Sequence, residues 1–334
     1  NKLKPAINKI LLIFVAFIGL NAYSQQTPLE DLYMLDRTHL NPAFTGTTIR
    51  MPVILTSRQQ WAQQFEYAPS TQAISLHKRI RNSKIKFTNR GFLNQGSNSA
   101  GNVGIGGSIF NHRSGAMART GIRFNYAYHI ELNNAELSFG LGASMTNYHV
   151  MIGGLTLPNE GAVIDPAIEK AKETTWIPDA HFGVFLYNES FFMGFSANQL
   201  FNSSILLGNK EAFDSESDDY DFDRIRQYNT EIGYKFKLGY DWEIEPSLLF
   251  KTTEKGNSRF DINSRVIYQQ NYWLGVSYRT QKAFMAIIGL KFENMVFAYC
   301  YEQELADIRT FVVSSHQIMV GLRIGEKRLG RSWR

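Results

Sequence analysis

The sequence predicts an all-β fold, an antiparallel outer-membrane β-barrel of about 14 strands with a short N-terminal helix. Three observations predict this fold. The chain begins with a short apolar segment that is typical of exported proteins, polar and apolar residues then alternate with a period of two, and short connections alternate with long ones. Because every backbone group must be paired within a bilayer, a closed barrel is the membrane fold that accommodates such strands.

Residues 1–24 are predicted to be a secretory signal peptide. Three lysines precede an unbroken apolar run from Ile10 to Leu20, and small side chains at Ala22 and Ser24 follow it. This order of charged, apolar and small residues is typical of a cleaved export signal. The run is too short to span a bilayer as a helix, although a retained anchor is the alternative interpretation. We therefore expect the mature chain to start near Gln25.

Residues 25–50 are expected to form a short helix followed by a turn. The stretch Thr27 to Glu30 matches a capping box with proline at the first helical position, and Leu29, Leu32 and Tyr33 form a helical stripe. We hypothesise that this helix lies either in the periplasm or in the lumen of the barrel.

Residues 51–325 are predicted to form the transmembrane barrel. Between Ile122 and Leu132, apolar and polar side chains alternate without interruption, and only a strand places the two sets on opposite faces. The candidate strands span about 9 to 13 residues, which suits a tilted membrane crossing. Fourteen candidates begin near residues 51, 70, 102, 120, 135, 180, 190, 228, 242, 259, 272, 283, 295 and 315. The charged residues that we assign to the lumen are Arg123, His129, Glu131, Glu231 and Lys235.

The connections between the candidate strands supply an independent test. Single-chain bacterial barrels have short periplasmic turns that alternate with longer outer loops. The longest odd-numbered connections are 151–179, 201–227 and 304–314, whereas the even-numbered connection 81–101 is a long exception. The other even-numbered connections are short, at Asn133-Asn134, Asn188-Glu189, Gly239 to Asp241, Gln269 to Asn271 and Glu293-Asn294. We therefore predict that the N-terminus lies on the periplasmic side of the outer membrane after signal cleavage.

No combination of residues indicates an enzyme or a cofactor site. The glycine-rich stretch 104–107 lies in a predicted strand without the helix that a nucleotide fingerprint requires, so we interpret it as close strand packing or curvature. Ser315 and His316 are neighbours in a strand and therefore point to opposite faces. His129 and Glu131 share a face, which we interpret as charged lumen lining. The net charge of +5 is modest and indicates no nucleic-acid partner.

One acidic segment is a weak candidate for calcium binding. Closely spaced carboxylates are ligands that calcium prefers, but the segment lacks the glycine of an EF-hand loop. A solvated acidic outer loop is the alternative interpretation. The candidate ligands are Asp214, Glu216, Asp218, Asp219 and Asp221.

A motif near the start of the predicted mature chain resembles a family signature. The stretch Leu40 to Gly46 is similar to the Asn-Pro-Ala-aromatic-x-Gly signature of the PorP/SprF family, outer-membrane proteins of the Bacteroidetes type IX secretion system. The chain departs from the family at Ser314 and Gln317 and in a basic C-terminal tail, residues 326–334. The positions that carry the resemblance include Asn41, Pro42, Ala43, Phe44, Gly46, Arg58, Trp61, Pro69, Thr71, Gln72, Ser315 and His316.

The resemblance implies a non-catalytic accessory barrel of the type IX secretion and gliding machinery. Its implied partners are outer-membrane lipid, a large secreted surface protein such as an adhesin with a type IX C-terminal domain, and periplasmic or outer-membrane secretion components. An outer-membrane channel for hydrophobic or small solutes is the alternative. A membrane-embedded hydrolase is a second alternative, which would need a nucleophile and a base paired across neighbouring strands. For the motif residues, we expect a geometric role in turns and tight backbone positions more than direct partner contact.

Overall fold

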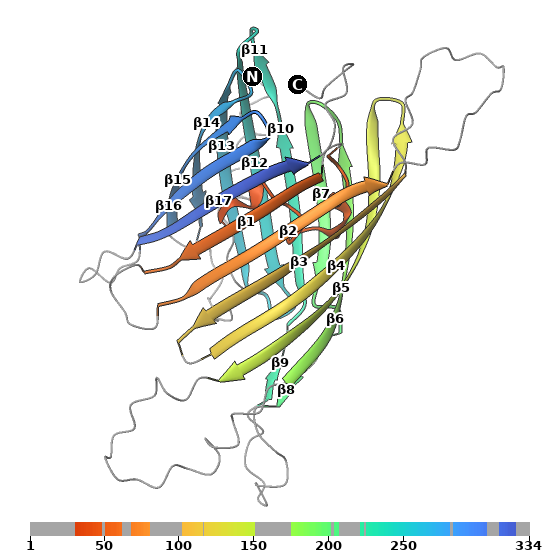
Figure 1. Ribbon diagram of the computed structural model, residues 1–334, viewed down its shortest axis with the longest axis vertical. Helices are drawn as coiled ribbons and strands as arrows, with labels where there is room; N and C mark the ends of the chain where they lie inside the picture. The colour runs from red at the N-terminus through yellow and green to blue at the C-terminus, as the bar shows by residue number, and fades with distance from the viewer. Residues whose placement is uncertain are drawn as a thin grey trace, which may run out of the picture.

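The computed structural model describes residues 31–48, 51–61, 68–80, 102–115, 117–150, 175–201, 204–206, 221–223, 225–280, 283–305 and 314–324. These residues form a closed antiparallel β-barrel of 14 strands, as predicted (Figure 1). The barrel closes because β1 (Met51–Gln59) pairs with β17 (Ser314–Ile324), from Met51 opposite Ile324 to Gln59 opposite His316.

The barrel strands follow one another in chain order around the wall. The first half continues with β2 (Ser70–Ile80), β3 (Val103–Ser114), β4 (Met117–Leu132), β5 (Ala135–Val150), β6 (Thr175–Tyr187) and β7 (Phe191–Asn198). The second half consists of β10 (Gln227–Tyr234), β11 (Phe236–Leu238), β12 (Trp242–Thr253), β13 (Ser258–Tyr268), β14 (Tyr272–Arg279), β15 (Ala283–Phe292) and β16 (Met295–Glu304), before β17. Both β10 and β11 pair with β12 on either side of Lys235, so together they make one barrel strand.

The two ends of the barrel differ in their connections, as the sequence predicts. At one end, here called the short-turn end, the turns 133–134, 188–190, 239–241, 269–271 and 293–294 join successive strands. The opposite end, here called the long-connection end, carries the connections 151–174, 199–226 and 305–313. A separate two-stranded hairpin of β8 (Ser204–Leu206) and β9 (Asp221–Asp223) belongs to the second of these and lies at the lower end of Figure 1.

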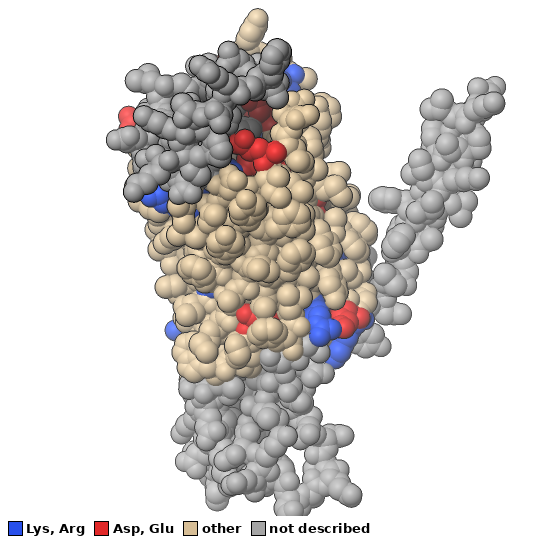
Figure 2. All heavy atoms as spheres, turned by 90° about the vertical axis from the view of Figure 1, so that its right-hand side faces the viewer, with Lys and Arg blue, Asp and Glu red and all other residues tan. Residues whose placement is uncertain are grey.

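The two faces of the wall differ in polarity in the way that the period of two predicts. Outward side chains are apolar and exposed, with Phe124, Leu274 and Ile288 more than half exposed. Figure 2 shows the result on one side of the molecule, where uncharged side chains cover the middle and most charged ones lie towards the two ends. Such a band is the surface that hydrocarbon requires of a membrane barrel, because an uncompensated charge is costly there.

The predicted short N-terminal helix is a 3-10 turn in the described residues, not a regular helix. Residues Asp31–Met34 form a single 3-10 turn, η1, and Leu32 has non-helical backbone angles (φ −87°, ψ 21°). A helix with one apolar stripe buries every third or fourth residue, but here the consecutive residues Leu32, Tyr33 and Met34 are all buried. The barrel wall surrounds the segment, so no polar face is needed. The predicted capping box at 27–30 and the signal peptide at 1–24 lie outside the described residues.

The sixth strand begins earlier than predicted. Pro178 and Asp179, which we expected to precede the strand, lie inside β6, which starts at Thr175. Proline is tolerated in a strand where no neighbour needs its missing N–H. That condition holds here, since β7 pairs with β6 only from Phe182 onward, and the preceding residues have β5 as their one partner strand among the described residues. In the part of the chain that the structure describes, no helix has the length and apolar character to span a membrane.

Candidate functional site

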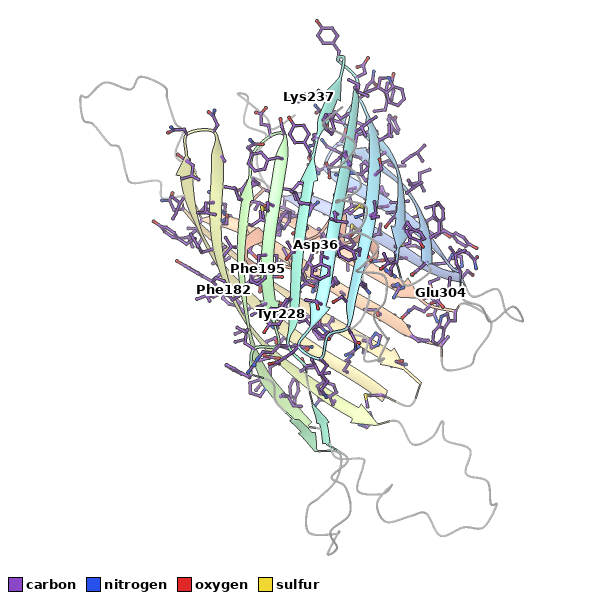
Figure 3. All side chains as sticks on the ribbon, turned by 180° about the vertical axis from the view of Figure 1, so that it is seen from behind. Asp36, Phe182, Phe195, Tyr228, Lys237 and Glu304 are labelled. Carbon is purple, nitrogen blue, oxygen red and sulfur yellow. The ribbon has the colours of Figure 1, made fainter. Side chains whose placement is uncertain are left out.

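Residues 31–48, here called the plug, lie inside the barrel, where Figure 1 shows them behind β1 and β2. Ala43 and Thr45 are completely buried, and Figure 3 shows Asp36 near the middle of the barrel. The turn η1 contacts β16 and β17, whereas a second 3-10 turn, η2 (Pro42–Phe44), contacts β4, β5 and β6. Because these strands lie on opposite sides of the wall, the plug crosses the lumen between them.

The first part of the plug packs into an apolar core. Leu32, Tyr33 and Met34 contact a cluster of inward side chains from one half of the wall. Polar contacts fix the same residues, because Leu32 N donates to Gln317 Oε1 at 3.2 Å and Asn263 Nδ2 donates to the Tyr33 hydroxyl at 2.7 Å. The wall residues of the cluster include Leu249, Ile267, Trp273, Met285, Ile287, Cys300 and Met319.

A buried ion pair ties the plug to the opposite part of the wall. Arg37 Nε donates to Glu231 Oε2 at 2.8 Å, and both side chains are at most 10% exposed. The Arg37 guanidinium also lies 4.2 Å from the centre of the Phe192 ring and 3.9 Å from Glu245 Oε1. A buried carboxylate needs such a partner because isolated burial of its charge is costly. Glu231 was predicted from the sequence to face the lumen, but its partner was not.

Asp36 organises the polar part of the plug. It accepts hydrogen bonds from the Thr38 backbone N at 3.0 Å, from the Thr38 hydroxyl at 2.5 Å and from Ser75 Oγ on β2. Burial raises the pKa of Asp36, but the charge of His39 and these hydrogen bonds outweigh it, so the pKa lies below its ordinary value. Asp36 therefore stays ionised and holds the plug against β2.

The Asn-Pro-Ala-Phe motif is the part of the plug that docks on β6 and β7. Asn41 Nδ2 donates to the backbone oxygens of Val184 at 3.1 Å and Phe195 at 3.2 Å, while its Oδ1 accepts from Ala43 N at 2.9 Å. The preceding Leu40 oxygen accepts from Ser196 Oγ at 2.7 Å. Asparagine suits this position because one short side chain supplies donors to the wall and an acceptor that caps η2.

Glycines in the wall leave room for this docking. A Cβ at Gly140 would overlap the backbone of Ala43, one at Gly183 would overlap the Asn41 side chain, and one at Gly104 would overlap the Thr45 oxygen. Close approach of plug and wall therefore requires glycine at these three positions. For the stretch 104–107 we predicted close strand packing or curvature, and at Gly104 the close neighbour is the plug.

Substitution of Gly140 by alanine is expected to destabilise the protein. The added methyl group meets plug backbone, which cannot rotate away, and overpacking of this kind costs about 1–3 kcal/mol. Gly275→Ala is the matched control, because the nearest atom to its Cβ would be Ile287 Cβ at 3.4 Å, an ordinary contact. The measurement is the temperature at which the detergent-solubilised barrel loses its compact gel mobility. Equal melting temperatures for the two variants would contradict the proposed close fit.

The end of the motif is held by aromatic and histidine side chains. Gly46 has a positive φ of 84°, a conformation that favours glycine, and its N–H donates to His77 Nδ1 at 3.1 Å. The Phe44 ring packs edge-on against His77 and Phe185, with ring centres 5.8 and 5.6 Å apart. These contacts give the aromatic and the glycine of the motif a geometric role.

His129 lies against the plug rather than in a catalytic pair with Glu131. It is completely buried, its Nε2 is 3.0 Å from the Thr45 oxygen, and its Nδ1 is 2.5 Å from Ser138 Oγ. Its carboxylate neighbour is Glu136, 3.2 Å away on β5. Glu131 is exposed near the end of β4.

The other lumen-facing candidates have separate roles. Arg123 Nη1 donates to the His39 oxygen of the plug at 2.5 Å. Lys235 is half-buried where β10 gives way to β11, 3.8 Å from Glu243 Oε2 and 3.9 Å from Glu245 Oε2. Both therefore contribute charged contacts on the inner side of the wall.

Arg58 belongs to a buried ionic ladder near the long-connection end. Its Nη2 donates to Glu302 Oε2 at 2.5 Å, Arg279 Nη1 donates to Glu302 Oε1 at 2.6 Å, and Arg279 Nε donates to Asp261 Oδ1 at 3.2 Å. The ladder thus links β1, β16, β14 and β13. Only Arg58 was singled out from the sequence. The period of two within their strands would also have predicted that Glu302, Arg279 and Asp261 face the lumen.

The remaining motif positions on the first and last strands lie on different faces. Trp61 Nε1 donates to Glu304 Oε1 at 3.2 Å, and Figure 3 shows Glu304 at the end of its strand. Ser315 is buried, whereas His316 lies on the outer side, 2.6 Å from the Tyr299 hydroxyl. The prediction that Ser315 and His316 point to opposite faces is confirmed.

The motif at the start of β2 is also divided between the faces. The Pro69 oxygen accepts from Gln60 N at 2.8 Å and so closes the first connection. Thr71 is buried, with its hydroxyl 2.8 Å from His112 Nδ1, whereas Gln72 is exposed.

The described residues contain no group of three or more side chains that could hold a metal ion. Of the calcium candidates, Asp221 begins β9. Asp214, Glu216, Asp218 and Asp219 lie outside the described residues, as do the long connection 81–101 and the basic tail 326–334.

Comparisons with known proteins identify a family. A family model described as "Type IX secretion system membrane protein PorP/SprF" matches residues 22–322. Among curated proteins, none matches the sequence significantly.

Similar solved structures include two toluene transporters and a FadL homologue. The toluene transporter TbuX of Ralstonia pickettii has 12% identity and a TM-score of 0.48, with 89% of this chain and 94% of that chain covered. A FadL homologue of Pseudomonas aeruginosa has 9% identity and a TM-score of 0.46, with coverages of 84% and 91%. The toluene transporter TodX of P. putida has 9% identity and a TM-score of 0.44, with coverages of 86% and 93%.

Proposed function

Because this chain belongs to the PorP/SprF family of type IX secretion system membrane proteins, we propose that it is a non-catalytic outer-membrane partner of a large secreted surface protein. In this proposal the barrel supports the export or the surface attachment of a client such as an adhesin with a type IX C-terminal domain. Components of the secretion machinery in the outer membrane or the periplasm are further proposed partners.

The plugged lumen is the observation that carries the proposal. The plug crosses the lumen from β16 and β17 to β4, β5 and β6, and buried contacts such as Arg37 to Glu231 and Asn41 to Val184 fix it there. A barrel whose interior is occupied by its own chain is poorly suited to the free passage of solutes. The parts of the molecule that remain available to a partner are the ends of the barrel and its outer surface.

We propose that the client binds at the long-connection end. The three longest connections of that end, 151–174, 199–226 and 305–313, provide more chain for recognition than the opposite end, where 81–102 is the one long connection among two- or three-residue turns. Long loops positioned by a rigid scaffold commonly carry binding functions. The N-terminal side, with the short turns, would then face the periplasm.

Deletion of the gene is expected to remove one specific large surface protein from the cell surface. The measurement is protease accessibility of surface proteins in intact cells, followed by gentle detergent purification of the tagged barrel and mass spectrometry. We expect the same type IX signal-bearing protein to be missing from deleted cells and recovered with the tagged barrel. A complemented strain is the control. If surface proteins are unchanged and the tagged barrel is recovered alone, the client proposal is wrong.

A further inference from the structure

A cavity of about 120 Å³ lies between the plug and the long-connection end of the barrel. The plug residues Tyr33, His39 and Leu40 contribute to one side of it. The rest of its lining comes from strand residues close to that end, such as Thr71 near the start of β2 and Tyr148 near the end of β5. Among the described residues, the cavity therefore lies on the side of the plug that faces the long-connection end.

The lining of this cavity is cationic. Arg119, Arg123 and Lys251 line it together with two histidines, and no aspartate or glutamate is among its described lining residues. All three cationic side chains are half-buried. In a partly desolvated site, positive charges from β4 and β12 attract an anion more strongly than they would in water.

The two inward carboxylates nearest along the lining strands each have contacts of their own, and Lys251 also acts electrostatically on Glu231. Glu231, two residues after Asn229 of the lining, is paired with Arg37. Asp179, two residues before His181, accepts hydrogen bonds from the backbone N of Ala180 at 2.7 Å and of Phe201 at 3.2 Å.

The size of the cavity limits what it can take. A volume of about 120 Å³ is several times the roughly 10–15 Å³ that one buried water requires. It admits a carboxylate group on a side chain or at a chain end, but no folded domain. Arginine is suited to such a ligand because its guanidinium binds carboxylates through two parallel hydrogen bonds.

We propose that this cavity binds a carboxylate from an acidic segment of a polypeptide that approaches the long-connection end. The inference rests on the proposed function, because a secreted client would supply that segment. It adds the chemistry of recognition, which is a carboxylate held by Arg119, Arg123 and Lys251. His39 also makes the plug part of the binding site, since its backbone oxygen fixes Arg123.

The test measures binding of a fluorescein-labelled hexaglutamate peptide to the purified full chain in detergent at low salt. Fluorescence anisotropy should show binding to the wild-type protein, while labelled hexaglutamine should not bind. The variant Arg119→Gln/Lys251→Gln should weaken binding at least about tenfold, because hydrogen bonds to charged groups are the stronger ones. Arg123 is left unchanged because it also contacts the plug.

Arg226→Gln is the matched control. Arg226 lies at the same end but outside the cavity lining, in an exposed pair with Glu254, so its loss should leave the affinity nearly unchanged. Equal weakening in this control, or unchanged affinity in the double variant, would overturn the cavity as the site. Displacement of the peptide by an equal concentration of inorganic phosphate would overturn its selectivity for polypeptide carboxylates.

The cell-surface experiment separates this inference from the proposed function. If the Arg119→Gln/Lys251→Gln variant still displays the client normally in cells and purified protein does not bind hexaglutamate, the client proposal stands and the cavity inference fails. If gene deletion affects no surface protein, the proposed function fails whatever the peptide result.

Discussion

Removal of residues 31–48 is expected to convert a closed barrel into an open pore. Barrels of about eight strands are filled by their own side chains, whereas those with 16–18 leave an aqueous channel, so the lumen of this 14-stranded wall has room that the plug now occupies. The lumenal side of the wall is also rich in polar side chains such as Asn125, Ser196 and Asn229, which water can solvate once the plug is gone. Single-channel recording in planar bilayers should show discrete conductance steps for the deleted variant and a quiet baseline for the intact protein.

Two controls make this experiment decisive. Heat-dependent gel mobility checks that the deleted variant still forms a barrel. If it does not, Gly140→Val tests the same prediction without a deletion, because a larger side chain at that position displaces the plug backbone and should produce intermittent openings. Large steady conductance of the intact protein would show that the plug does not block the lumen and would favour the channel alternative.

Replacement of Arg37 by methionine is expected to destabilise the folded protein by about 3–5 kcal/mol, the usual cost of leaving a buried charge without its partner. Glu231 is only 4% exposed and accepts the hydrogen bond from Arg37 Nε at 2.8 Å. Loss of the guanidinium also removes its contact with the Phe192 ring, 4.2 Å away. Urea-dependent unfolding of the refolded barrel in lipid vesicles measures the difference.

The exposed pair of Arg226 and Glu254 is the matched control for this prediction. Its charged atoms are 3.1 Å apart, but the side chains are 37% and 45% exposed, so Arg226→Met should cost at most about 1 kcal/mol. Adding Glu231→Gln to Arg37→Met should restore part of the stability, because the uncompensated carboxylate is then gone. Equal losses for Arg37→Met and Arg226→Met would contradict a role of Arg37 in anchoring the plug.

The wall of the barrel could be predicted from local sequence patterns. Fourteen predicted starts correspond to the fourteen barrel strands, and the largest error is at the sixth strand, expected near 180 and found at Thr175. Each strand must present apolar side chains to lipid and polar ones to the lumen. Every strand segment therefore shows a period of two that can be recognised locally. Strand length was predicted less well, since β4 and β5 have 16 residues each and we expected about 9 to 13.

The contents of the barrel were decided by the tertiary structure. Alternation indicated that Glu231 faces inward, but Arg37, its partner, lies 194 positions away in the sequence. The docking of Asn41 on β6 and β7 and the glycines that admit the plug depend in the same way on which inward positions face one another across a closed wall. The sequence by itself determined the face on which each side chain lies. The closure and stagger of the strands decided what it meets there, because they bring together residues that no local period relates.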